Sequence, residues 1–101
     1  MSSQAAVDIG QLVTRSPEIR GGRPCIAGTG VAVKRIAGWH RRGMEPEEIA
    51  AQYGHLTLAQ VHAALAYYYA NREEIEADLE TEAAEYDRLM QQSTTAVPPG
   101  G

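Results

Sequence analysis

The sequence has no phenylalanine, a single cysteine, a single tryptophan and no long apolar run. One cysteine, Cys25, cannot form a disulfide within the chain, which is typical of proteins that work in a reducing compartment. No apolar stretch reaches the roughly 18 residues that a membrane-spanning helix needs, and the start, MSSQAAVDIG, lacks a basic segment followed by an apolar one. We therefore expect a cytoplasmic protein.

The chain is also short, and its 101 residues exclude a two-domain enzyme. A catalytic cleft would use most of so small a core, and no side chains form a recognisable nucleophile and base arrangement. Cys25, His40, His55 and His62 stand in four separate segments without the paired spacing of metal ligands. We expect a protein that is not an enzyme and holds no metal or other cofactor.

Charge is distributed unevenly along the sequence. Residues 1–44 carry seven basic and two acidic side chains, whereas residues 45–101 carry two basic and eleven acidic ones. Opposite charge in two halves of a small protein indicates two different partners, or one half that docks on the other in an oligomer. An ordinary solvated surface with uneven statistics is the simpler alternative.

The pattern predicts a mainly α-helical fold that follows a short extended segment. Residues 11–14 and 24–27 are short β-prone runs, the second within the glycine-rich stretch GGRPCIAGTG. A helix is predicted at about residues 33–42 and ends at Gly43. The next helix begins at Pro46, which suits a first helical position.

A third helix is predicted from the capping box that Thr57 and Gln60 form. Its buried side consists of apolar residues at spacings of three and four, namely Leu58, Val61, Leu65 and Tyr68. An acidic helix then runs to about Gln91, and we favour a bend near Asn71 over one continuous helix. The predicted layout is a flexible N-terminus, a helix-turn-helix-like domain, an acidic partner-binding helix and a flexible tail, at residues 1–10, 11–70, 71–91 and 92–101.

The second and third helices have the outline of a helix-turn-helix, a motif that places one helix in the DNA major groove. The candidate recognition helix, TLAQVHAALAYYYA, carries no charge, although phosphate attraction dominates affinity for DNA. Basic residues on one face of the preceding helix would supply that charge. The DNA-binding candidates are Lys34, Arg35, Arg41, Arg42, Gln60, His62 and Tyr67. The residues alone leave DNA contact open.

The acidic helix carries a narrow apolar stripe of residues that recur at helical spacing: Ile75, Leu79, Ala83, Tyr86 and Met90. A narrow stripe on a strongly acidic helix usually seals against another surface. Arg72 and Arg88 are added to this set, because an arginine fork fits a carboxylate of a nuclease site well. These seven residues are the partner-binding candidates.

Four segments form a combination that is more specific than any one of them. They are GRPCIAGT at 22–29, VAV at 31–33, GMEPEEIA at 43–50, and Leu56-Thr57 with Val61, Ala64, Leu65 and Tyr67. Together, over about residues 12–70, they resemble the bacterial domain of unknown function 433 family, whose members look like small antitoxins of VapB type. The resemblance implies a homeodomain-like or winged-helix-like fold after a short β segment. It also implies a type II toxin–antitoxin pair, a toxin with a PIN-like nuclease domain and autoregulation by operator binding.

Two positions depart from the pattern of that family. Its members usually carry an arginine after the Gly-Thr pair, where this chain has Gly30, so the role of that arginine does not carry over. Cys25 stands where valine is typical, which is a conservative change within a core.

These observations lead to one hypothesis and one alternative. The hypothesis is an antitoxin-like protein that neutralises a PIN-like nuclease, has operator DNA as a further partner, and forms a homodimer or higher homo-oligomer through its N-terminal segment and early helices. Its acidic helix would cover the toxin, with carboxylates that complement a positive RNA-binding groove. The alternative is a protein-only adaptor or self-associating module, in which the basic half of one subunit meets the acidic helix of another.

Overall fold

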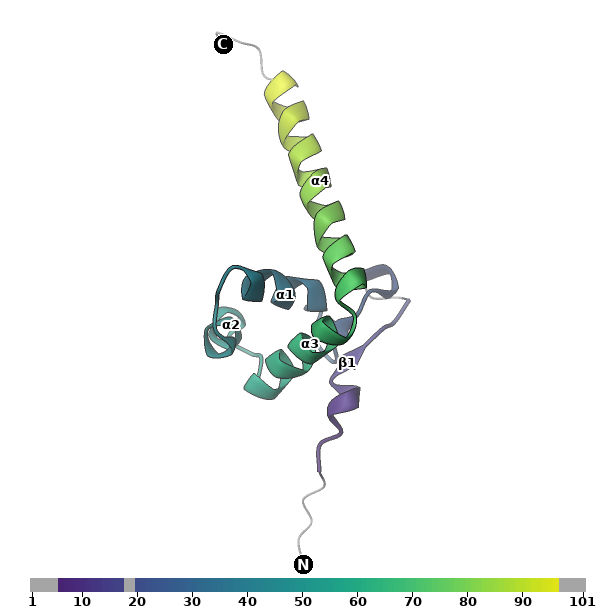
Figure 1. Ribbon diagram of the computed structural model, residues 1–101, viewed down its shortest axis with the longest axis vertical. Helices are drawn as coiled ribbons and strands as arrows, with labels where there is room; N and C mark the ends of the chain where they lie inside the picture. The colour runs from purple at the N-terminus through teal and green to yellow at the C-terminus, as the bar shows by residue number, and fades with distance from the viewer. Residues whose placement is uncertain (1–5, 18–19, 97–101) are drawn as a thin grey trace, which may run out of the picture.

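The structure, a computed structural model, describes residues 6–17 and 20–96, which form a small helical body and one long helix that projects from it (Figure 1). In chain order the elements are the 3-10 turn η1 (Ile9–Gln11), β1 (Val13–Thr14), η2 (Arg20–Gly22), β2 (Cys25–Ile26), α1 (Val33–Arg41), α2 (Pro46–Tyr53), α3 (Leu58–Ala70) and α4 (Arg72–Ala96). The predicted fold class, mainly helical with a short N-terminal β segment, is confirmed.

The two strands form a small antiparallel sheet that packs against α3. Val13 pairs with Ile26, and Thr14 pairs with Cys25. The turn after β2 is closed by the Thr29 hydroxyl, which donates to the carbonyl of Ile26 at 2.8 Å. Cys25 is buried, as expected for a small apolar residue.

The helices begin and end close to the residues that the capping pattern predicts. Pro46 is the first residue of α2, and Gly54 ends that helix in the left-handed conformation with φ of 77°. The capping box of α3 is formed as predicted: the Gln60 N–H donates to the Thr57 hydroxyl at 3.1 Å, and the Thr57 N–H donates to the Gln60 side chain at 2.8 Å. Helix α1 ends at Arg41, one residue before the predicted end.

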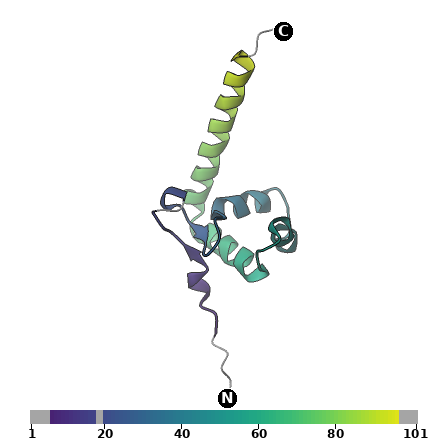
Figure 2. The same ribbon diagram turned by 180° about the vertical axis from the view of Figure 1, so that it is seen from behind.

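Helices α3 and α4 are separate, and the chain changes direction between them (Figure 2). Asn71 interrupts the helical conformation with φ of −134° and ψ of 48°, and its side-chain amide donates to the Tyr67 carbonyl at 3.1 Å. The predicted bend is confirmed. Helix α4 continues to Ala96, five residues beyond the end predicted at Gln91, and residues 97–101 of the predicted tail lie outside the described residues.

The N-terminal segment that was predicted to be flexible is only partly described. Residues 1–5 lie outside the described residues. From Asp8 onward the chain is ordered into η1, because the Asp8 carboxylate accepts a hydrogen bond from the Gly10 N–H at 3.0 Å.

The core lies between the sheet, the three short helices and the first turns of α4. Its most deeply buried apolar residues are Ile26, Val33, Ile36, Ala37, Ile49, Val61, Ala64, Tyr68 and Ile75. The prediction was wrong for Leu58, which is 40% exposed. Leu58 is the first residue of α3 and lies beside an exposed capping box, so the core does not reach it.

Candidate functional site

A row of carboxylates on α4 faces the body. Glu74, Asp78 and Glu82 recur every four residues, so they lie on one side of the helix over about 12 Å. Each carboxylate forms an ion pair with a basic residue from the N-terminal half of the same chain. The two oppositely charged halves of the sequence therefore meet within one molecule.

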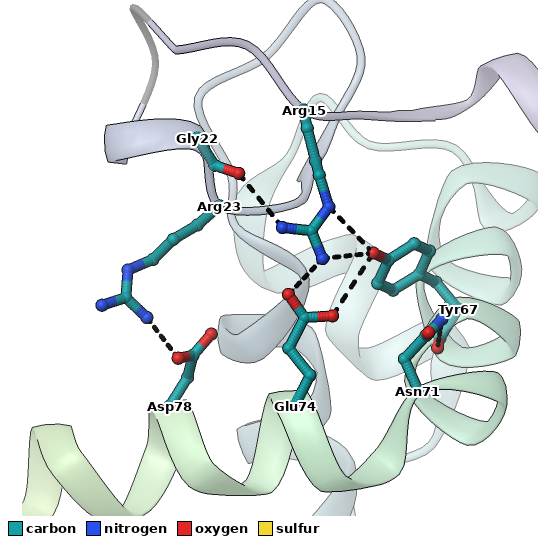
Figure 3. Close-up of polar contacts among 7 residues, drawn as sticks. All are labelled: Arg15, Gly22, Arg23, Tyr67, Asn71, Glu74 and Asp78. Atoms are coloured by element: carbon teal, nitrogen blue, oxygen red, sulfur yellow. Dashed lines mark hydrogen bonds and ion pairs between the residues drawn. The ribbon is translucent and has the colours of Figure 1, made fainter.

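Arg15, which follows β1, joins the N-terminal segment to both α3 and α4 (Figure 3). Its guanidinium donates to the Tyr67 hydroxyl at 2.8 and 3.2 Å and to the Gly22 carbonyl at 3.3 Å, and it forms an ion pair with Glu74. These bonds, above all those to Glu74 and Tyr67, raise the pKa of Arg15. Tyr67, a DNA-binding candidate, is thus engaged in holding α4 against the body.

The next two carboxylates of the row pair with cations from the segment before β2 and from the first turn of α1. Arg23 forms an ion pair with Asp78 (Figure 3). Glu82 accepts hydrogen bonds from Arg35 at 2.8 and 3.4 Å and lies 3.5 Å from the Lys34 ammonium group. Burial acts to raise the pKa of Glu82, but the two cations outweigh it, and the pKa lies below its ordinary value.

The seven DNA-binding candidates do not form one exposed cationic surface. Lys34 and Arg35 lie at a carboxylate, and the Gln60 side chain closes the capping box. Arg41 and Arg42 are exposed at the end of α1. Among the residues that the structure describes, neither of these two arginines forms an ion pair.

The last of these candidates, His62, is exposed on α3. The neighbouring exposed side chains on that face of the helix, Ala59 and Ala66, are small and uncharged. This face therefore offers little attraction for a phosphate backbone.

A second polar cluster holds the start of α4. The Tyr68 hydroxyl donates to the Glu76 carboxylate at 2.7 Å, and Arg72 donates to the same carboxylate at 3.0 and 3.3 Å. Burial, followed by the proximity of Glu76, raises the pKa of Tyr68, while the hydrogen bonds from Tyr68 and Arg72 lower the pKa of Glu76. Arg72 also lies over the rings of Tyr68 and Tyr69. This partner-binding candidate is therefore engaged within its own chain.

The apolar stripe of α4 divides into a buried part and an exposed part. Ile75 is fully buried, and Leu79 packs against the core. Every side chain from Ala83 to Gln92 is exposed. We call residues 83–96 the arm. We call its apolar residues the ridge: Ala83, Tyr86, Leu89 and Met90.

Leu89 is a member of the ridge that the sequence prediction omitted. It is 60% exposed, compared with 63% for Tyr86 and 49% for Met90. Its spacing of three residues from Tyr86 is the signal that could have identified it. Arg88 is exposed too, but by helical periodicity it lies on the opposite side of the arm from Tyr86.

A groove separates the end of α1 from α4. Its residues on α1 include Gly38, Trp39, Arg41 and Arg42, and those on α4 include Leu79, Ala83, Tyr86 and Asp87. A β-carbon on Gly38 would lie 3.7 Å from the Leu79 side chain, so the two helices are close at the inner end of the groove. Its α4 wall runs from Leu79 into the first turns of the arm.

Two further classes of site are absent from the part of the chain that the structure describes. Within residues 6–17 and 20–96, no three histidine, cysteine or acidic side chains are grouped so that they could hold a metal ion. In the same residues, no helix combines the length and the apolar character needed to cross a membrane.

Comparisons with known proteins find a family described without a function. A family model described as "Protein of unknown function (DUF433)" matches residues 13–68. A crystal structure of a DUF433 member protein from Anabaena variabilis ATCC 29413 is similar, with a TM-score of 0.65 and 27% identity over 69% of each chain. No curated protein sequence matches. The family match covers the body from β1 to α3 and ends before α4.

Proposed function

The chain belongs to the DUF433 family, and we propose that it acts as an antitoxin-like protein that neutralises a PIN-like nuclease toxin by laying its arm across that toxin. The class of partner comes from the resemblance to VapB-type antitoxins. The observation that supports the proposal is the arm, which projects from the body (Figure 1). The apolar side chains of its ridge are exposed. An exposed ridge on an isolated helix is typical of a segment that binds a groove on another protein.

The spacing of the ridge fits this mode of binding. Ala83, Tyr86, Leu89 and Met90 follow one another at intervals of three, three and one residues, which keeps them along one side of the arm. Complete burial of a large apolar side chain contributes about 1.5 to 3 kcal/mol. Because Tyr86 and Leu89 are each more than half exposed, both have most of this energy still to gain from a partner.

The charge beside the ridge favours a basic partner. By helical periodicity Glu85 and Asp87 flank the ridge on opposite sides. A nuclease holds RNA in a positive groove, and carboxylates on both flanks of the ridge would complement such a groove. Arg88 would reach the carboxylates of a nuclease site only from the far side of the arm. We therefore propose the ridge and its acidic flanks as the main inhibitory surface.

Co-expression of the full chain with the product of the adjacent gene tests this proposal. The double variant Tyr86→Ala/Leu89→Ala is expected to weaken binding on the order of 100-fold and to release the nuclease activity, because it removes two anchors of the ridge. The measurements are co-purification, titration calorimetry and RNA cleavage.

The matched control for this experiment is Leu58→Ala, which removes an exposed leucine from α3 and is expected to leave binding unchanged. Circular dichroism checks that both variants keep their helices. Full binding and full inhibition by the double variant would contradict the proposed role of the arm.

A protein-only adaptor is the second candidate, and the ion pairs within the chain favour it. Lys34 and Arg35 lie at Glu82, so a phosphate that approached them would also meet a negative charge. The candidate recognition helix carries no charge of its own. Operator binding would therefore depend mainly on Arg41 and Arg42.

Electrophoretic mobility of the DNA upstream of the gene separates the two candidates. If the protein binds its operator, Arg41→Ala/Arg42→Ala is expected to weaken binding and to reduce the salt dependence by about one phosphate contact for each arginine. Lys34→Ala/Arg35→Ala is the matched control with the smaller expected effect. Absence of any salt-sensitive shift with the unchanged chain would support the adaptor.

A further inference from the structure

The groove beside α1 and the ridge of the arm form one continuous surface. Leu79, Ala83 and Tyr86 line the groove, and Leu89 and Met90 continue the same side of α4 beyond it. Helical spacing keeps these residues in line. A helix that lies in the groove would therefore also lie along the ridge.

The wall that α1 contributes to the groove suits a helix in shape. Gly38 has no side chain, so α1 and α4 approach closely at the inner end of the groove, where Leu79 lies opposite Gly38. Trp39 is half-buried, and its indole N–H donates to the Tyr53 hydroxyl at 3.1 Å, so the ring is held in place as an apolar wall. Arg41 and Arg42 form the outer rim, where the Arg42 guanidinium lies over the Trp39 ring.

The charged residues around the groove indicate which kind of helix it binds. The carboxylate row already pairs with the cations near the sheet and the start of α1. Among the described residues, Arg41 and Arg42 on the groove and Glu85 and Asp87 on the arm form no ion pair within the chain. The rim of the groove on α1 is thus basic, whereas the flanks of the arm are acidic, and Asp87 brings part of that acidity to the α4 side of the groove.

We propose that the groove binds the arm of a second copy of this chain, with the two copies related by a two-fold axis near Ala83 and Tyr86. In a two-fold contact each copy supplies both the groove and the arm, so the ridge of each lies in the groove of the other. The two α4 helices run antiparallel, and the small side chain of Ala83 lets them approach closely. Met90 of each copy then covers Leu79 of the other, and the acidic flanks of each arm meet Arg41 and Arg42.

This inference goes beyond the proposed function and does not depend on it. It uses α1, one of the early helices that the sequence predicted at a homodimer contact, and it adds the arm. A basic partner protein would compete for the same ridge, so the test uses the purified full chain alone.

Sedimentation equilibrium with charge-reversed chains tests the pairing. The unchanged chain is expected to form a dimer at micromolar concentration. Arg41→Glu/Arg42→Glu and Glu85→Arg/Asp87→Arg are each expected to raise the dimer dissociation constant by at least about tenfold, because each variant places like charges across both contacts. An equimolar mixture of the two variants is expected to restore the dimer, since both contacts then join opposite charges.

Glu73→Arg is the matched control, a charge reversal on an exposed turn of α4 outside the groove, and it is expected to leave the dimer unchanged. Circular dichroism confirms that each chain remains helical. A monomer in the unchanged chain, or a dimer that both charge-reversed chains retain, would overturn the inference. Because no toxin is present in the experiment, neither result would contradict the proposed function.

Discussion

The first and second halves of α4 are one helix with opposite surroundings. From Arg72 to Glu82 the helix is fastened to the body by a buried isoleucine, a packed leucine, three carboxylates that pair with cations of the body, and a fourth that accepts a hydrogen bond from Tyr68. From Ala83 to Gln92 every side chain is exposed, although the same apolar stripe continues. The apolar pattern is therefore necessary for packing but does not decide where packing ends.

The two halves of α4 differ in burial because the body contacts only the first of them. Helix α1 approaches α4 near Leu79 and ends at Arg41, so none of the body's described elements lies beyond the groove to cover the ridge (Figure 1). The acidic residues differ in the same way. Glu74, Asp78 and Glu82 of the first half meet cations from the sheet region and α1, whereas Glu85 and Asp87 form no ion pair with the residues that the structure describes. The first half of α4 thus belongs to the fold, and the arm is available for binding.

Truncation of one apolar residue in each half of α4 is expected to give the largest difference in stability between the two halves. Ile75→Ala is expected to lower the free energy of unfolding by about 2 to 5 kcal/mol, because it leaves a cavity in the core. Met90→Ala in the arm is expected to change it by less than about 0.5 kcal/mol. Urea unfolding at a concentration low enough to avoid self-association measures both values. Equal losses in the two variants would show that the arm packs on its own chain.

Local sequence signals predicted most of the fold because they depend on neighbouring residues. Pro46, Gly54 and the capping box at Thr57 place the helix boundaries within a residue or so. The bend at Asn71 was also predicted, because Asn71 with Glu74 three residues later is a pattern that can cap a new helix. Leu58 was misplaced because periodicity alone does not show how far a core extends along a helix.

The candidate site was harder to predict because it depends on contacts between distant residues. Arg15 contacts Tyr67 and Glu74, which lie 52 and 59 positions further along the chain. The sequence showed opposite charge in the two halves but not which cation meets which carboxylate. The recurrence of Glu74, Asp78 and Glu82 at every fourth residue is the signal that could have indicated one charged face toward the body.

Neutralisation of the carboxylate row is expected to give a smaller difference in stability between the two halves of α4. The triple variant Glu74→Gln/Asp78→Asn/Glu82→Gln is expected to lose on the order of 1 kcal/mol of stability near neutral pH, because each pair is partly exposed and screened by solvent. Glu85→Gln/Asp87→Asn in the arm is the matched control and is expected to leave the stability of the monomer unchanged. Thermal unfolding at low and high salt measures the difference, which high salt should reduce.

The dependence of this loss on pH separates an electrostatic cause from a change in packing. In the folded state the pKa of Glu82 lies below its ordinary value, so between the two values the unfolded chain binds more protons than the folded one. The contribution of Glu82 is therefore fully present above the ordinary glutamate range and is lost as the pH falls through the lower folded pKa. The difference in stability between the unchanged chain and the triple variant should shrink on acidification, and a difference that stays constant would mean that the substitutions act through packing.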